Sequence, residues 1–280
     1  MKLKYLGTAA AEAIPAIFCE CDTCKEARKR GGKNIRTRSQ AIVDGRLLID
    51  FPPETYMHSI LHGVDMTPIK DVIITHSHAD HLYPDDIDKR APVFSHYKCG
   101  DDAYFRFYGS AEVGDKIASV INNERLKESG RFSFIKLSPF IPTNIDRYTV
   151  TPLPARHSPV TGPYIYMISD GQKNMLYAHD TGTFFDEVFD YIEKTGIRFD
   201  FVSLDCTSGD AKMDNDHHMN LDKCILMSDK LKNIGAADAK TLFCLNHFSH
   251  NGGNVLYEEF SEKAGKFGFL TSYDGMETEF

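Results

Sequence analysis

The sequence predicts an α/β protein built as a sandwich, with sheets inside and helices outside. In each half of the 280-residue chain, segments with strand character precede segments with helical spacing, which is the element order of a layered fold. The stretch Val72-Ile73-Ile74 is also apolar without alternation, which indicates a strand buried on both faces, as in a sheet covered by helices. Because sandwiches of this size are often single units, we expect one domain over residues 1–280.

The first half begins with short strands separated by clear turn signals. Residues 2–6 are predicted as a strand that ends at Gly7, and Asp44-Gly45 marks a hairpin between two apolar runs. Pro52-Pro53 favours the start of a helix, since proline fits the first helical turn. The predicted strands cover 2–6, 39–43, 47–50 and 70–75, and the predicted helix covers 52–61.

Two segments of this half lack regular periodicity. Residues 19–38 are polar and basic, with room for a short helix at 22–29, and we expect a loop that needs a stabilising link such as a bound metal. Residues 91–123 are rich in aromatic side chains, and we interpret this stretch as an insertion. Core packing is the default expectation for its aromatic residues, and a lid facing the substrate is the alternative.

The second half alternates strand and helix signals more regularly. Asn220 or the residue before it is a candidate N-cap for a helix, and an asparagine side chain can accept a hydrogen bond from the first helical turn. The predicted strands cover 131–137, 148–153, 164–169, 174–178, 199–204 and 241–245, and the predicted helices cover 183–195, 220–232 and 253–266.

The overall composition limits the compartment and the partners. No segment reaches the roughly 18 uninterrupted apolar residues of a membrane helix, and the N-terminus has no apolar stretch of secretory length, so we expect a cytoplasmic protein with no membrane partner. A net charge of -8 argues against a broad basic surface for nucleic acid. A small anionic substrate would need only a few local cations or metals.

The motif His76-Ser77-His78-Ala79-Asp80-His81 carries the chemistry. It places three histidines and one carboxylate directly after the buried strand, and alternate residues can point to one side while Asp80 and His81 face a second point. Imidazole prefers zinc, manganese or iron, and a carboxylate adds a harder oxygen ligand. The motif therefore predicts two neighbouring divalent cations, zinc or manganese.

Further ligands are available after three other predicted strands. His157, Asp180 and His247 each follow the end of a strand, where a sheet would bring them to one edge. A site with two cations needs such additional ligands, including one that bridges the two. We therefore expect these three side chains to join the first motif.

With these residues the chain resembles the metallo-beta-lactamase fold superfamily of hydrolases, whose fold is an αββα sandwich of two mixed sheets flanked by helices. The resemblance implies that Asp180 bridges the two cations and that Asp80 belongs to the catalytic residues. It also implies that Asp50 orients the ligand loop from behind. The implied ligands of one cation are His76, His78 and His157, and those of the other are Asp80, His81 and His247.

A cysteine cluster predicts a separate metal. Cys19, Cys21 and Cys24 supply three thiolates without a fourth cysteine nearby, so a tetrahedral zinc would need a remote ligand, for which His250 is available. This arrangement is similar to that of the PhnP-like cyclic phosphodiesterases, in which such a loop and a histidine hold a structural zinc. The alternative is a group of reduced thiols with no metal.

The resemblance to the PhnP-like branch, and to the related tRNA-processing nucleases, also implies a general acid. His218 in His-Met-Asn is the better match, and His217 is the alternative. The implied function is hydrolysis of a small cyclic or nucleotide-like phosphodiester, in which two metals activate water and His218 protonates the leaving oxygen.

Several other functions stay open at this point. The alternatives are a tRNA-processing-type nuclease, a thioester or lactone hydrolase on the same fold, and a non-hydrolytic metalloprotein. Because relatives of this kind are often dimers, a homodimer is a further expectation. The substrate itself is not encoded in any motif, since one fold supports many reactions.

Overall fold

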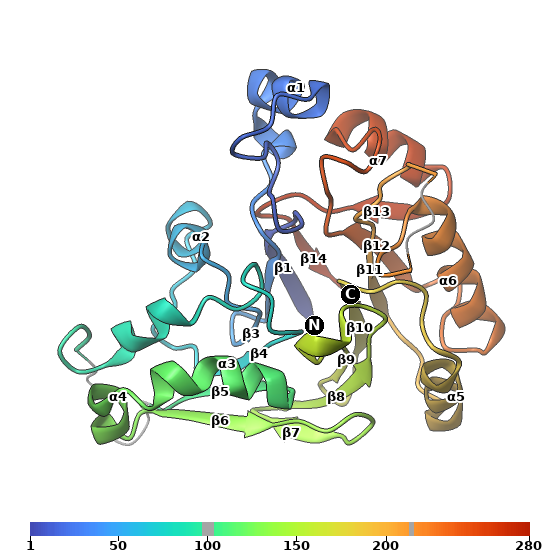
Figure 1. Cartoon of the computed structure of the whole chain (residues 1–280). Helices are drawn as coiled ribbons and strands as arrows, with labels where there is room; N and C mark the ends of the chain where they lie inside the picture. Colours follow the sequence, from blue (N-terminus) through green and yellow to red (C-terminus); the bar gives the residue numbers. More distant parts are fainter. Residues whose placement is uncertain (97–103, 213–215) are drawn as a thin grey trace.

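The computed structural model describes residues 1–96, 104–212 and 216–280, and these form two seven-stranded mixed sheets (Figure 1). In each sheet, antiparallel pairs at one end give way to parallel pairs at the other. The first sheet contains, in spatial order, β14 (Glu277–Glu279), β1 (Lys2–Gly7), β2 (Gln40–Val43), β3 (Leu47–Ile49), β4 (Asp71–Ile73), β5 (Phe105–Gly109) and β6 (Phe132–Lys136). The second contains β13 (Phe269–Thr271), β12 (Leu242–Asn246), β11 (Phe201–Asp205), β10 (Asn174–Ala178), β9 (Tyr164–Ser169), β8 (Tyr148–Pro154) and β7 (Thr143–Ile145).

The two sheets pack against each other through a buried apolar layer. Alternate residues of each strand face this layer, as Ala41 and Val43 of β2 do, whereas Ile42 between them faces the helices of its own sheet. Met175 and Tyr177 of β10 contribute from the opposite sheet. Side chains on both faces of the central strands are therefore buried, as the apolar run before the histidine motif predicted.

Helices cover the outer faces of both sheets, so the predicted αββα architecture is confirmed. Figure 1 shows α5, α6 and α7 together beside the second sheet, with α2, α3 and α4 on the side of the first. Asn220 caps α6 through its side chain, which accepts from the Lys223 amide as predicted. The helices are α1 (Asp22–Arg30), α2 (Thr55–Leu61), α3 (Ala111–Ile121), α4 (Glu124–Ser129), α5 (Asp186–Thr195), α6 (Leu221–Asn233) and α7 (Tyr257–Gly265).

The predicted insertion at 91–123 lies partly outside the described residues, at 97–103, and the described remainder belongs to the first sheet and its helices. Residues 105–109 form β5, which pairs in parallel with both β4 and β6, and the helix α3 follows. Phe105 and Phe107 are buried under the outer layer of the first sheet, so core packing explains part of the aromatic content. The prediction missed β5 because its aromatic and arginine residues, FRFYG, give no apolar run of the kind seen in β4.

The segment 19–38 contains the predicted short helix, α1, and otherwise runs as turns and isolated bridges. The side chain of Cys21 caps α1 by accepting from the amide of Cys24, and Arg36, fully buried, ties the segment to the carbonyl of Ser272. None of the helices in the described part of the chain combines the length and apolar character that crossing a bilayer demands.

Candidate metal centre

The parallel halves of both sheets end at one place. Asp50 follows β3 and His76 follows β4 in the first sheet, while Asp180, Asp205 and His247 lie at or just after the ends of β10, β11 and β12 in the second. Carboxyl ends of parallel strands lie along the same edge of a sheet, which is where ligands bind in open α/β folds. The edges of the two sheets meet, and residues that are far apart in sequence therefore lie close together.

Hydrogen bonds between the sheets fix the histidine motif at this meeting point. The Tyr166 hydroxyl of β9 donates to the carbonyl of Ile74 at 2.6 Å, and the Tyr164 amide donates to the carbonyl of Thr75 at 2.8 Å. The second sheet therefore holds the backbone immediately before His76. These contacts explain why the motif lies against a strand that comes 92 residues later in the sequence.

His76, His78 and His157 form the first donor set. Nδ1 of His78 lies 2.8 Å from Nε2 of His76 and 3.2 Å from Nε2 of His157. Burial lowers the pKa of His76 well below its ordinary value and that of His157 to about 4, so both rings are neutral at physiological pH. Three imidazoles pointing at one small volume are a donor set that suits a divalent cation.

Asp80, His81, Asp180 and His247 form the second donor set. Oδ2 of Asp180 lies 2.5 Å from Nε2 of His81, 3.1 Å from Nε2 of His247 and 3.6 Å from Nε2 of His76. Asp180 is thus within reach of both sets. The side chains expected to bind the two cations lie together in the structure, in the two groupings that the family resemblance implied.

The carboxylates in and around this second set favour a bound positive charge. Burial acts to lower the pKa of His81, but the nearby carboxylates, Asp50 first, outweigh it and raise the pKa well above its ordinary value. Burial likewise opposes the charge of His247, yet Asp180 raises the pKa of this residue to about 10. Metal ions displace such protons from histidine when they bind. The buried histidine and aspartate clusters therefore fit a binuclear metal site.

Three residues of the site adopt backbone conformations that are rare for residues other than glycine. Asp50, Asp180 and His247 have φ angles of 67°, 50° and 65°, and each comes directly after or within two residues of a strand. Left-handed backbone costs on the order of 1 kcal/mol for such residues and persists where the surrounding structure enforces it. Here it turns each side chain from the strand direction toward the donor sets.

Asp50 lies behind the ligands, as expected. Its carboxylate accepts from the amide and the hydroxyl of Thr75 at 2.7 and 2.9 Å and lies 2.7 Å from Nδ1 of His81. With Nδ1 held in this way, Nε2 of His81 is the nitrogen that points at Asp180 and Asp80. Asp50 therefore fixes the orientation of His81.

Sequence reasoning missed Asp205, a fully buried carboxylate at the end of β11. It accepts from the amides of Thr207 and Met219 and lies 3.3 Å from Nδ1 of His218. Burial opposes the charge of His218, but Asp205 outweighs it and raises the pKa of His218 above its ordinary value. The available signal was its position, an aspartate at the end of the predicted buried strand 199–204.

The neighbouring histidines differ in position. His218 is mostly buried and lines the cavity with the donor sets, while the adjacent His217 is exposed, with its ring centroid 6.1 Å from that of His157. His179 and His58, for which the sequence gave no motif, are buried and hydrogen-bonded to Ser203 and Gln40, respectively. Both behave as core histidines with satisfied hydrogen bonds.

A cavity of about 370 Å³ opens onto the donor sets. Its size suits a small molecule. Among the described residues its lining contains no lysine or arginine. The lining consists of Ala10, Ala11, Glu12, His78, Asp80, His157, Asp180, Thr207, Ser208, His218, His247, Ser249 and Asn251.

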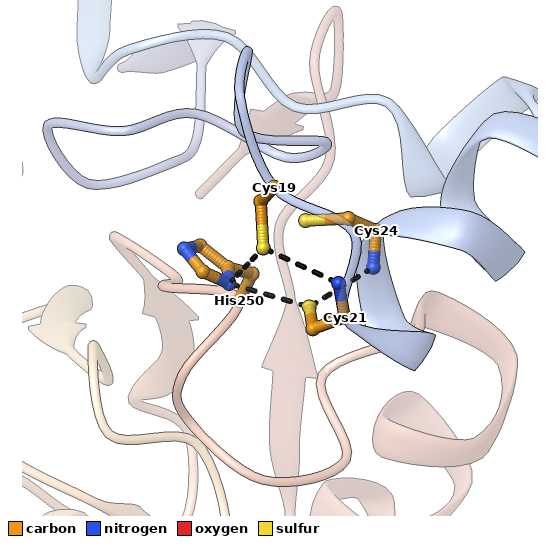
Figure 2. A group of neighbouring side chains, drawn as sticks. All are labelled: Cys19, Cys21, Cys24 and His250. Carbon is orange, nitrogen blue, oxygen red and sulfur yellow. Dashed lines mark hydrogen bonds between the residues drawn. The ribbon is translucent and has the colours of Figure 1, made fainter.

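The cysteine cluster is a second, separate group. Figure 2 shows the sulfurs of Cys19 and Cys21 facing the ring of His250, whose Nδ1 lies 3.6 and 3.5 Å from them. Cys24 completes the group, with all four ligand atoms within 4.8 Å of one another. The sequence prediction of these four residues as neighbours agrees with the structure.

The thiols of this cluster also suit a metal. Burial raises the pKa of Cys21, but hydrogen bonds, that of the Cys24 amide first, outweigh it and lower the pKa to about 6. Burial raises the pKa of Cys24 to about 12, so this thiol ionises at neutral pH only with the help of a cation. The group could therefore hold a structural metal.

Comparisons with known proteins agree with this geometry. A family model described as "Beta-lactamase superfamily domain" matches residues 46–247, and no curated protein sequence matches the chain. A diphosphatase of the PhnP family is similar in structure, with a TM-score of 0.75 and 20% identity over 100% of this chain and 96% of its own.

Two further solved structures have the same fold. Zn²⁺-bound PqqB from Methylobacterium extorquens has a TM-score of 0.68 and 14% identity, covering 100% of both chains. The short form of human tRNase Z has a TM-score of 0.63 and 16% identity, covering 100% of this chain and 99% of its own. At these identities the structural likeness shows the fold.

Proposed function

This chain belongs to the metallo-beta-lactamase superfamily, and we propose that within it the protein is a metal-dependent phosphodiesterase that hydrolyses a small cyclic or nucleotide-like phosphodiester. The observation that carries the proposal is the position of His218, which lines the same cavity as both donor sets and is held by Asp205. When the leaving group of an ester is poor, a hydrolase benefits from an acid beside the metals that protonates the leaving oxygen.

The histidine and aspartate side chains would hold two cations. His76, His78 and His157 would bind one and Asp80, His81 and His247 the other, with Asp180 between them. Zinc or manganese bound there would supply an activated water and positive charge for the phosphoryl oxygens. Asp50 keeps Nε2 of His81 directed at the site throughout.

His218 would protonate the leaving oxygen. Its Nδ1 faces Asp205 at 3.3 Å and Asp180 at 3.5 Å, so the proton available for transfer is the one on Nε2. The raised pKa favours the protonated ring, and Asp205 stabilises its charge. Thioester and lactone hydrolysis place less demand on such an acid, and this difference favours phosphodiesters.

The cavity favours a small substrate over tRNA. Its volume is about 370 Å³, and no lysine or arginine belongs to its described lining. A nucleic-acid site normally contains several such cations to contact phosphates.

We further propose that the cysteine cluster with His250 binds a zinc ion, because three thiolates and one imidazole form a closed structural site.

Metal analysis coupled to a substrate panel tests the proposal. The panel contains a bis-aryl phosphate, a ribose cyclic phosphate, a thioester and a lactone, together with a diphosphate diester suggested by the PhnP-family diphosphatase. We expect three metal ions per chain and turnover of phosphodiesters that falls sharply in His218→Ala. Preference for the thioester or the lactone would refute the proposed function.

A further inference from the structure

We infer that Glu12, held by Ser249, binds a free hydroxyl group on the alcohol part of the substrate, so that the substrate class is a sugar or polyol phosphodiester. This inference rests on the proposed function for the identity of the phosphodiester group. It assigns a ligand contact to a residue of the cavity lining outside the metal ligands.

Glu12 lies in the turn that follows β1 and lines the cavity together with Ser249 and Asn251. The two preceding residues, Ala10 and Ala11, also line the cavity and leave room beside the carboxylate. Exposure of its side chain is 32%, so the carboxylate is accessible from the cavity without being free in solvent.

The contacts that orient the Glu12 carboxylate all involve one of its two oxygens, Oε1. The Ser249 hydroxyl accepts from the Asn251 amide at 3.1 Å and donates to Oε1 of Glu12. Nε2 of His250 lies 3.7 Å from the same oxygen, while Nδ1 of His250 faces the sulfurs of the cysteine cluster. Glu12 is thereby connected to the second metal group as well as to the cavity.

The other carboxylate oxygen, Oε2, remains available. No residue in the described parts of the chain donates a hydrogen bond to it, and an ionised carboxylate only accepts hydrogen bonds. A hydroxyl group is a neutral donor that satisfies this oxygen without bringing a second negative charge. The rest of this wall, Ser208, Ser249 and Asn251, is polar and uncharged, which also suits hydroxyl groups.

The charge of Glu12 opposes substrates with an additional phosphate. The described cavity lining contains no lysine or arginine that would neutralise a second anionic group. A phosphate at this wall would be placed next to a carboxylate, and like charges at short range repel one another. Glu12 would therefore select a hydroxyl-bearing phosphodiester over its phosphorylated form.

Three probes separate these contributions. Glycerol cyclic phosphate carries one free hydroxyl, propanediol cyclic phosphate carries none, and phosphorylated glycerol cyclic phosphate carries a second anionic group. Binding is measured by calorimetry on the metal-loaded protein in the His218→Ala background, where turnover is slowed. The same probes are compared in this background with Glu12→Ala, with Glu12→Gln and with Glu193→Ala, a control at an exposed glutamate of α5.

We expect glycerol cyclic phosphate to bind about tenfold more tightly than propanediol cyclic phosphate, because a hydrogen bond to a charged group has about this effect. Glu12→Ala should remove the preference, Glu12→Gln should improve binding of the phosphorylated probe, and Glu193→Ala should change neither. Equal affinity for the first two probes, absence of binding by all three, or a preference that survives Glu12→Ala overturns the inference.

The same probes separate this inference from the proposed function. If the hydroxyl preference depends on Glu12 but the wild-type protein hydrolyses no phosphodiester, the hydroxyl contact stands and the phosphodiesterase proposal falls. If the wild-type protein hydrolyses both cyclic phosphates without preference, the phosphodiesterase proposal stands and the role of Glu12 falls.

Discussion

The two candidate metal groups differ in ligand chemistry and in access. The histidine and aspartate group combines nitrogen and oxygen donors, includes Asp180 between its two sets, and opens to a cavity. The cysteine group has three sulfurs and one imidazole, and none of its members lines that cavity. Open sites with carboxylates suit catalysis, whereas closed thiolate sites suit structure. The two groups therefore suit different roles in the proposed function, catalysis for the first and stabilisation for the second.

One short segment joins the two groups. His247 belongs to the first and His250 to the second, and the buried Phe248 between them exchanges backbone hydrogen bonds with Thr8 and Ala10. A change in the cysteine group can therefore reach the active site through only a few residues. Variants in each group measure how far the two groups act independently.

The largest expected effect is that of Asp180→Ala. This change removes the carboxylate that lies within 3.6 Å of nitrogens in both donor sets. We expect kcat/KM for a bis-aryl phosphate to fall on the order of a thousandfold, since charge stabilisation at the reacting group is lost. Metal analysis should show fewer bound ions with the cysteine-bound ion retained.

Asp200→Asn is the control for this experiment, because Asp200 is a carboxylate of the same sheet region that pairs with Lys173 away from the cavity. It should retain wild-type turnover and metal content. Full activity in Asp180→Ala would contradict the assignment of this site as the catalytic one.

His218→Ala is expected to have the next largest effect. Loss of a general acid lowers the rate by about a hundredfold or more for an alkyl leaving group, and by less for a nitrophenolate, which leaves without protonation. The comparison of kcat for the two leaving groups measures this difference. His217→Ala is the matched control, since this ring is exposed and does not line the cavity. An equal loss for both leaving groups would argue against acid catalysis.

Asp50→Asn tests the support behind the ligands. The variant keeps the shape but removes the charge that faces Nδ1 of His81 at 2.7 Å, and we expect metal affinity or kcat/KM to fall by about 10- to 100-fold. Asp71→Asn removes a buried carboxylate of β4 that pairs with Arg106 instead. It should lower thermal stability without lowering metal affinity, and similar metal affinities in the two variants would contradict the role of Asp50.

Much of this site could be predicted from local sequence. The histidine motif occupies six consecutive residues after a buried strand, and His157, Asp180 and His247 follow strands whose apolar runs are evident. Asp205 also follows a predicted buried strand, but its role was missed because it depends on contact with His218, which is thirteen residues away in sequence. Glu12 depends on the even more distant Ser249.

The strands likewise differ in whether their own sequence or their pairing partners define them. Long strands such as β8 and β9 have strong apolar patterns and were predicted close to their observed bounds. β7, β13 and β14 have three residues each, as β3 and β4 do, but their sequences TNI, FLT and ETE do not belong to a longer apolar run, and they are defined by pairing with longer neighbours. β5 was masked by aromatic residues that also suit an insertion.

The pH dependence of turnover tests the contact between Asp205 and His218. A general acid works when protonated, so the rate falls as pH rises through its pKa. Because the pKa of His218 is raised, this fall should occur at a pH above the ordinary histidine pKa of about 6.5. Asp205→Asn removes the main charge that raises this pKa, so the alkaline limb of the kcat profile should move to lower pH.

Asp190→Asn, at an exposed residue of α5, is the control for the pH profile and should leave the alkaline limb in place. An unchanged profile in Asp205→Asn would show that another group sets this limb. A shift toward higher pH would contradict the sign expected from removing a negative charge.

The smallest expected effect on turnover is that of Cys21→Ser, because no member of the cysteine group lines the cavity. We expect one metal ion per chain to be lost and stability to fall by more than about 2 kcal/mol, which lowers Tm by about 5 °C or more for a chain of this size. Cys244→Ser, at a buried cysteine of β12, should destabilise the protein without changing its metal content.

Since His250 also contacts Glu12, kcat/KM in Cys21→Ser should fall by less than about tenfold, and mainly through KM. A loss of kcat as large as that of Asp180→Ala would mean that the segment from His247 to His250 couples the two groups tightly, and that the cysteine-bound metal is part of the catalytic machinery.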